Sequence, residues 1–250
     1  MRAYLTLLRR ELAVYFLNLI GYVIIATTAF LTGLSLAVML IKLEGLSTPL
    51  PVTQLFYATP FFWLIVLLSA PIITMRLFAQ EKSSGTFETL MTAPVSDLQV
   101  LLAKFSAAWI FYLTMWLPLL ASLLILNRYT SETAALNGGT LGGMFLGISL
   151  IGAAFMALGC LSSALTRSQI ISGMTCLAGG LSLFLLSFLN EKLSLDNGFW
   201  VSVFNCLSMF EHMNDFARGI VDTRALVFYL SITVIFLFLA LRVLESRRWK

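Results

Sequence analysis

The sequence predicts an all-α polytopic membrane protein with six transmembrane helices. Hydrophobic residues make up 59% of its 250 residues and charged residues 11%, whereas soluble domains average about 25% charged residues. Six apolar segments are each long enough to cross roughly 30 Å of hydrocarbon as a helix. Polar segments separate them. We therefore expect a single membrane domain over residues 1–250, surrounded by membrane lipids.

The first segment, residues 2–19, predicts an amphipathic helix lying in the membrane interface. Arg2 and Arg9 lie on a face where they would meet anionic headgroups. Another face is apolar, with residues recurring at steps of three and four: Leu5, Leu8, Leu12, Tyr15 and Leu19. An extension of the first membrane helix is the alternative interpretation. The apolar run that follows is too long for the core of a signal peptide.

Local sequence signals mark the starts of two spans and one kink. Pro60 begins the second span, and Pro71 inside it predicts a kink because proline removes a backbone hydrogen bond. The pattern Ser96-x-x-Gln99 predicts a capping box at the start of the third span. The predicted spans are residues 20–41, 59–79, 98–126, 140–165, 169–190 and 225–244.

Residues 191–224, between the last two spans, differ from the other connections. Residues 199–207 are apolar but too short to cross a bilayer, which is typical of a re-entrant or interfacial segment. Polar residues follow, including His212, the only histidine. We expect two short helices here that dip back toward the membrane, with His212 in water or at the interface.

The basic residues predict that both chain ends face the cytoplasm. Six spans put the two ends on the same side, and cytoplasmic segments carry the excess of Lys and Arg. Eleven basic residues fall on the side of the chain ends and five on the other side. The eleven are Arg2, Arg9, Arg10, Arg76, Lys82, Lys104, Arg167, Arg242, Arg247, Arg248 and Lys250.

Few side chains within the spans offer chemistry of their own. The basic ones lie near span ends, where they are expected to snorkel toward water: Lys42, Arg76, Lys104 and Arg242. The deep carboxylates that ion-coupled transporters usually need are missing. Nucleophile-elbow and zinc-binding motifs are absent from the sequence, as is a basic stripe interleaved with aromatics. We therefore expect no enzyme activity, metal, cofactor or nucleic-acid partner on this chain.

Glycines at a spacing of four predict a close approach between helices. Gly139, Gly143 and Gly147 share one face of the fourth span, which lets a neighbouring helix come near. Packing within the subunit is one interpretation. A dimer contact or a gating contact is the other.

The segment over residues 81–94 is a short charged element between two spans, predicted to lie in the cytoplasm. Ser83 or Ser84 can begin a helix, and Pro94 ends it. A helix this short is marginal alone in water, so it needs a partner surface. A contact with the groove of a soluble domain fits this design, and a solvated helix near the headgroups is the alternative. The sequence contains no Gly-x-x-x-x-Gly-Lys-Ser/Thr loop, so an ATP site would have to lie on another chain.

The residues Glu81-Lys82-x-x-Gly85-Thr86-x-Glu88-x-Leu90-x-x-x-Pro94 closely resemble the cytoplasmic motif of ABC-2 type transporter permeases. The stretch from Phe210 to Gly219 and the tail Leu244-Glu245-Ser246-Arg247-Arg248-Trp249 look like the permeases grouped with gliding-motility and nitrous-oxide-reductase-maturation transporters. This resemblance extends over essentially the whole chain.

The resemblance implies a dimeric permease of the bacterial inner membrane that exports a substrate or performs a related task. Each protomer would sit on a separate cytosolic ATPase that holds ATP and Mg²⁺, and an external-domain auxiliary subunit is a further expected partner. Residues 81–94 would be the coupling helix that contacts the ATPase. Its contact residues would be Glu81, Lys82, Gly85, Thr86, Phe87, Glu88, Leu90 and Pro94. An ATP-independent secondary transporter and a membrane assembly scaffold are the alternatives.

Overall fold

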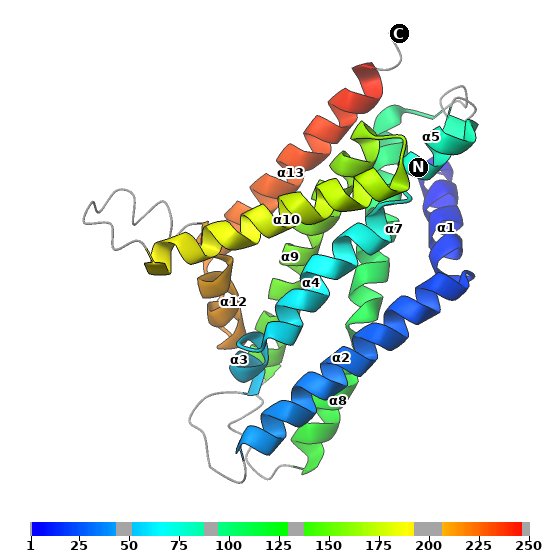
Figure 1. Cartoon of the computed structure of the whole chain (residues 1–250). Helices are drawn as coiled ribbons and strands as arrows, with labels where there is room; N and C mark the ends of the chain where they lie inside the picture. Colours follow the sequence, from blue (N-terminus) through cyan, green and yellow to red (C-terminus); the bar gives the residue numbers. More distant parts are fainter. Residues whose placement is uncertain (1, 44–51, 88–94, 130–137, 193–206, 247–250) are drawn as a thin grey trace.

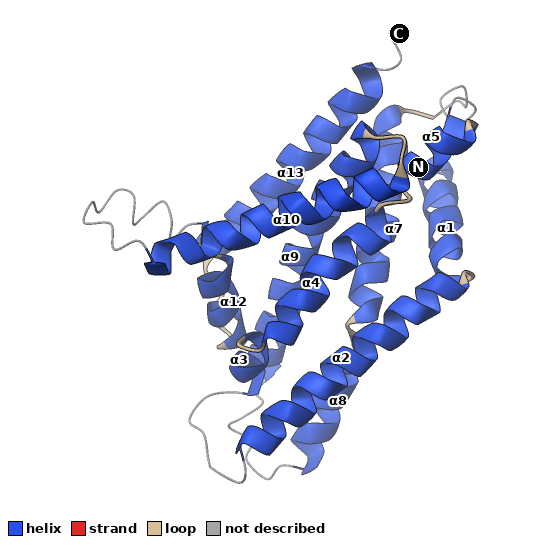
Figure 2. Ribbon diagram, in the orientation of Figure 1, coloured by secondary structure: helices blue, strands red, loops and turns tan. Residues whose placement is uncertain are grey.

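The computed structural model describes residues 2–43, 52–87, 95–129, 138–192 and 207–246, and these residues contain helices and no strand (Figure 2). Six helical segments among them are long and apolar enough to cross a membrane. The structure therefore confirms the predicted all-α class with six candidate spans. They are Leu19–Ile41, Pro60–Ser84, Asp97–Leu126, Gly138–Leu165, Gln169–Ser187 and Thr223–Ser246.

Helix α9 (Gly138–Leu165) occupies the centre of the bundle (Figure 1). It packs against four other spanning helices: α4 (Pro60–Thr74), α7 (Asp97–Met115), α10 (Gln169–Lys192) and α13 (Thr223–Ser246). Small residues allow these contacts. At Gly152, for example, a methyl group would lie 2.1 Å from the ring of Tyr112 on α7. The core thus depends on helices that approach α9 more closely than larger side chains would permit.

The chain enters the bundle through two separate helices. Helix α1 (Arg2–Phe16) ends before a bend at Leu17 and Asn18, and α2 (Leu19–Leu43) follows. The side chain of Asn18 accepts a hydrogen bond from the backbone N–H of Ile20 at 3.2 Å, which satisfies one free donor at the start of α2. The predicted helix over residues 2–19 is therefore three residues too long, and the alternative of a simple extension is wrong.

Helix α1 packs lengthwise against α7 through a face that coincides only in part with the predicted apolar face. Leu5 and Leu19, from the predicted apolar face, are 60% and 77% exposed. Tyr15, from the same predicted face, does pack against the core, and its ring stacks on that of Phe111 with centroids 4.9 Å apart. Leu7, outside the predicted face, also packs against the core. The face shifts because Glu11, which looks like a surface residue, points toward α7.

The second span is interrupted one turn after Pro71. Helix α4 ends at Thr74, residues 75–78 form a turn, and α5 (Ala79–Ser84) continues the chain. The hydroxyl of Ser163 on α9 accepts hydrogen bonds from the backbone N–H groups of Phe78 and Ala79, both at 3.0 Å. A side chain of the central helix therefore holds the junction in place.

The third span is also interrupted, which the sequence analysis missed. The hydroxyl of Ser96 accepts from the Gln99 N–H at 3.3 Å, as the predicted cap requires. Helix α7 then ends at Met115, and α8 (Leu117–Tyr129) follows Trp116. Pro118 provides the physical reason, because it has no N–H to continue the hydrogen bonds of α7.

Two short helices pack together at the end of the bundle opposite α5 (Figure 1). The sequence analysis missed α3 (Val52–Tyr57) and expected α12 (Met209–Ala217) as one of two short helices. The other expected helix falls largely in residues 193–206, outside the described part. The Thr53 hydroxyl donates to the Ala217 carbonyl oxygen at 2.7 Å, and that of Tyr57 donates to Met144 of α9 at 2.8 Å. These hydrogen bonds join α3 to α12 and to the central helix α9.

His212 on α12 is buried, so the expectation of a solvated or interfacial histidine is wrong. Its side chain is 7% exposed and packs against the rings of Phe228 and Tyr229, with centroids 5.5 and 5.8 Å away. Burial lowers the pKa of His212, opposed by the charges of Asp215 and Asp222. The neutral imidazole is therefore favoured in the folded protein.

Candidate functional site

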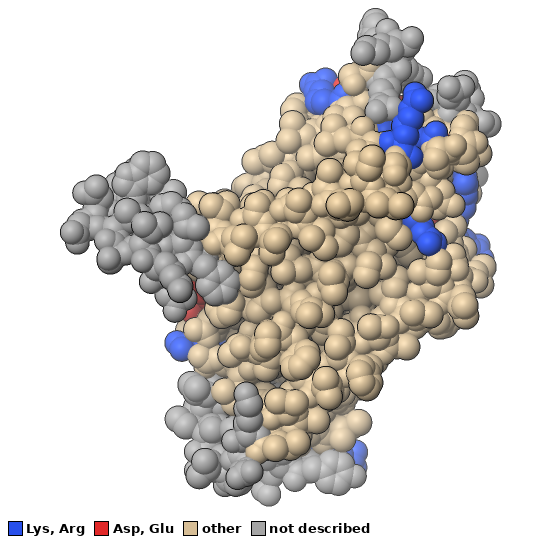
Figure 3. Space-filling model, viewed as in Figure 1, with Lys and Arg blue, Asp and Glu red and all other residues tan. Residues whose placement is uncertain are grey.

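The motif that the sequence analysis singled out begins in α5, at the end of the bundle where α1 also begins and α13 ends (Figure 1). Figure 3 shows lysine and arginine side chains gathered toward this end, with a broad uncharged surface over the middle of the molecule. A basic end beside an apolar belt is typical of a protein whose cytoplasmic side lies there.

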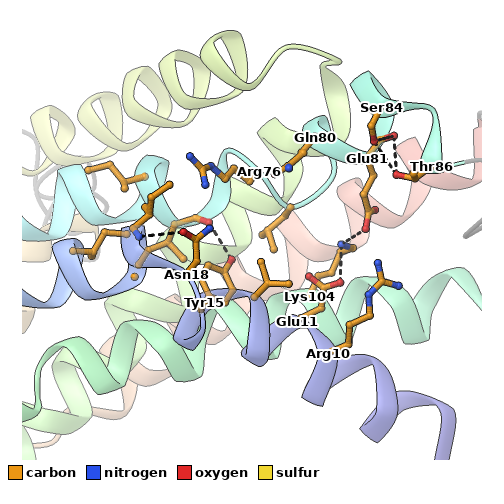
Figure 4. Close-up of a pocket in the computed structure, with 17 residues that line it drawn as sticks. Arg10, Glu11, Tyr15, Asn18, Arg76, Gln80, Glu81, Ser84, Thr86 and Lys104 are labelled. Carbon is orange, nitrogen blue, oxygen red and sulfur yellow. Dashed lines mark hydrogen bonds and ion pairs between the residues drawn. The ribbon is translucent and has the colours of Figure 1, made fainter.

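Lys104 of α7 is buried between two carboxylates that come from other helices. Its Nζ atom lies 3.1 Å from Oε1 of Glu11 on α1 and 2.7 Å from Oε1 of Glu81 on α5 (Figure 4). The side chain of Lys104 is 4% exposed, and those of Glu11 and Glu81 are 12% and 15% exposed. The expectation that Lys104 snorkels into water is therefore wrong. A buried ammonium group persists here because carboxylates compensate its charge.

We call Glu11, Lys104 and Glu81 the ionic cluster. It joins three helices at one point, across sequence separations of 93 and 23 residues. The cluster holds two negative charges and one positive charge, and Oε2 of Glu81 has no hydrogen-bond partner in the structure. Lys104 is thus the cation that bonds both carboxylates where α1, α5 and α7 meet.

Lys82, the second charged residue of the motif, also points into the protein. Its amino group donates a hydrogen bond to the carbonyl oxygen of Ala164, near the end of α9. The same group lies 5.3 Å from the ring centroid of Phe87, which is half-buried against the core. Neighbouring residues of the motif therefore connect α5 to different parts of the bundle, Glu81 to α1 and α7 and Lys82 to α9.

Residues 83–86 are the exposed part of the motif. Ser83 and Ser84 lie in the last turn of α5, where their hydroxyls donate to the carbonyl oxygens of Gln80 and Glu81. They end a helix instead of beginning one, because the second span continues through them. Gly85 has φ of +74°, a left-handed conformation that suits glycine and closes α5. Glu88, Leu90 and Pro94 lie outside the described residues.

A cavity of about 280 Å³ adjoins the ionic cluster, between α1, the start of α2, the end of α4 and α5. Figure 4 shows Arg10 and Glu11 entering it from α1, with Arg76 and Gln80 on the opposite side. Apolar side chains complete its lining, among them Ile20, Ile24 and Ile72. The site therefore combines charged groups with a surface suited to hydrocarbon.

The glycines of α9 contact the short helix α12 within the chain. A methyl group at Gly143 would lie 2.5 Å from the carbonyl oxygen of Phe216, and one at Gly147 would lie 3.0 Å from the Phe216 ring. Gly139 has open space at its own Cβ position, but its backbone lies next to Gly219, which has φ of +80°. These contacts lie within one subunit, as the packing interpretation of the glycine pattern expects.

The sequence predicts a role for Glu81 and Lys82 but not for the residues that hold them. No role was predicted for Glu11, and Lys104 was expected to snorkel from a span end. The only local signal was a lysine inside the third span, two turns from its start. Among the described residues, no group of three or more His, Cys, Asp or Glu side chains gathers in a way that could hold a metal ion.

Comparison with known proteins assigns the chain to a broad group. The profile of the family described as "ABC-2 family transporter protein" matches residues 41–243, which is most of the chain. No curated protein matches the sequence. The family match agrees with the resemblance found in the motif over residues 81–94.

Proposed function

The chain belongs to the ABC-2 family of transporter proteins, and we propose that it is a permease subunit through which a separate cytosolic ATPase drives transport. The absence of a nucleotide-binding loop from this sequence supports the division of labour, since ATP and Mg²⁺ would then be held by the partner. Membership of the family implies a membrane component of a transporter and not an enzyme. It disfavours an ATP-independent carrier.

The ATPase would dock on residues 83–94, with the exposed residues 83–86 at the start of the contact. The family resemblance alone would place all the charged residues of the motif against the ATPase, and this assignment differs from that expectation. Glu81 and Lys82 are bonded to α7 and α9, so their role is to hold the docking element to the spans. Gly85, Thr86 and the following residues would supply the contact surface.

The ionic cluster is the observation that carries the proposal. A displacement of α5 by the ATPase would reach α7 through Lys104 and reach α1 through Glu11. ATP would shift the balance between two arrangements of the bundle by binding one of them more tightly through the ATPase. The spans need no intramembrane ion pathway for such a mechanism.

The rest of the assembly follows the family resemblance. We propose a dimer of permease subunits in a bacterial inner membrane, with both chain ends in the cytoplasm and with export as the task. The tail residues favour a relative of the gliding-motility and nitrous-oxide-reductase-maturation group, in which an auxiliary subunit with an external domain would be a further partner. Substrate identity is not implied by the fold.

Disulfide cross-linking to the ATPase tests the docking assignment. Thr86→Cys and Leu90→Cys are expected to cross-link to cysteines placed in the ATPase groove, and more strongly with ATP than without it. The matched control is Ile220→Cys, which is 55% exposed but lies between α12 and α13. The native Cys160 and Cys176 are buried and will not compete. Cys206, which lies outside the described residues, is replaced by serine in every variant. Equal cross-linking at Thr86, Leu90 and Ile220 would reject the docking surface.

Transport measurements separate the proposal from its alternatives. Reconstituted vesicles should move substrate only when the ATPase and ATP are both present. Flux in the absence of the ATPase would support a secondary transporter. A stable complex with neither flux nor nucleotide-dependent movement would support an assembly scaffold.

A further inference from the structure

The cavity beside the ionic cluster has a cation that the cluster does not use. Arg76 lies at the turn between α4 and α5, and its Nε atom is buried without a hydrogen-bond partner in the structure. The two carboxylates of the cavity, Glu11 and Glu81, are both bonded to Lys104. Three cationic and two anionic side chains line the cavity, so its net charge is positive. An anion would complete the site.

The remainder of the lining suits a hydrocarbon chain. Apolar residues from three helices and from the turn between α4 and α5 line the cavity: Val14, Ile20, Ile24, Ile72, Ile73 and Leu77. Val14, Ile20 and Ile72 are 56%, 37% and 41% exposed, so the apolar lining continues onto the outer surface of the bundle. A small soluble anion would make no use of this surface, whereas the acyl chain of a lipid would cover it.

We infer that this cavity binds the headgroup of an anionic phospholipid, with the phosphate at Arg76. A guanidinium group binds phosphate through paired hydrogen bonds. Gln80 lies near Arg76 and Asn18 lies beside Tyr15, and both supply neutral polar groups to the lining (Figure 4). Arg10, exposed on α1, adds a second positive charge at the rim. The acyl chains would run along Ile20, Ile24 and Ile72 into the bilayer.

The position of the site gives the lipid a mechanical role. The bend between α1 and α2 lies on one side of the cavity and the turn between α4 and α5 on the other. A bound lipid would join these two connections and so strengthen the attachment of α1 to the docking element. Anionic lipids are concentrated in cytoplasmic leaflets, on the side where basic residues gather.

Native mass spectrometry of the full chain in detergent tests the inference with two lipids of equal chain length. Phosphatidylglycerol should be retained at least fivefold more tightly than phosphatidylcholine, because one arginine contributes about a fivefold change in affinity for an anionic headgroup. Arg76→Gln should remove most of this preference, and Arg76→Lys should retain part of it. The matched control is Arg167→Gln, an exposed arginine between α9 and α10 that is not part of the cavity.

Three results would overturn the lipid site. The first is equal retention of the two lipids by the unmodified chain. The second is an Arg76→Gln effect no larger than that of Arg167→Gln. The third is displacement of phosphatidylglycerol by millimolar inorganic phosphate, which would identify a site for a free anion. A single symmetrical peak in size exclusion shows that each variant is folded. The lipid dependence of thermal unfolding, lost in Arg76→Gln and kept in Arg167→Gln, supplies the second measurement.

Discussion

Replacement of Lys104 by methionine should be the most destabilising single change in the ionic cluster. Methionine preserves most of the volume of the side chain but removes the ammonium group that bonds both Glu11 and Glu81. Removing one partner of a buried ion pair costs about 3–5 kcal/mol. Because the two carboxylates keep 12% and 15% exposure, we expect the low end of this range, about 3 kcal/mol.

The same geometry predicts a much smaller effect for a change in either carboxylate. Glu81→Gln leaves Lys104 paired with Glu11 and removes the excess negative charge of the cluster. This variant should lower the free energy of unfolding by about 1 kcal/mol, which is the net contribution of a typical hydrogen bond. The triple variant with Glu11→Gln, Glu81→Gln and Lys104→Met should recover most of the stability lost in Lys104→Met, since no unpaired charge remains.

Unfolding in mixed micelles, followed by tryptophan fluorescence, measures these free energies. Lys104→Met should be the most destabilised variant. The triple variant and Glu81→Gln should be destabilised less, and to a similar extent. If Lys104→Met costs no more than Glu81→Gln, the carboxylates are screened by water and the reasoning fails. ATPase stimulation is the separate functional measurement, and the triple variant should be folded yet stimulate the ATPase weakly.

Three further predictions concern other sites. Gly143→Ala should destabilise the protein by about 1–3 kcal/mol because its methyl group would meet the Phe216 backbone, whereas Gly142→Ala, with open space, should be neutral or slightly stabilising in the same unfolding assay. His212 has a lowered pKa in the folded state, so its contribution to stability is present above about pH 6.5 and lost as the pH falls below it; thermal unfolding at several pH values should show this loss, and His212→Gln should reduce it. Glu88→Lys should lower ATPase stimulation while membrane insertion, measured by fractionation, stays intact.

Hydropathy and length were sufficient to predict the six spans because both are local properties of the chain. The interruptions of the spans required finer signals. Pro71 was recognised, but the helix breaks one turn later, where Ser163 of α9 can bond the free N–H groups. Pro118 was a usable signal for the break after Met115 and was overlooked. Helix α3 has six residues and too little periodicity to be predicted.

The ionic cluster could not be predicted from local patterns. Glu11 and Lys104 are 93 residues apart, and only the packing of α1 on α7 brings them together. The predicted apolar face of the first helix contained Tyr15, which packs on the core, but also Leu5 and Leu19, which are exposed, and it did not contain Glu11. A carboxylate with a buried cationic partner belongs to the packed face, and the partner is known only once the helices are placed.

The two inward-pointing residues of the motif explain how a short helix can transmit movement. A helix of six residues held at one point would rotate about that point when pushed. Helix α5 is held by Glu81 to α1 and α7, by Lys82 to α9, and at its start by Ser163 of α9. Attachments to different helices oppose rotation, so a displacement of α5 would be shared between α7 and the central helix. Glu81 and Lys82 would therefore make the proposed docking element rigid, and the exposed residues 83–86 would be free to contact a partner.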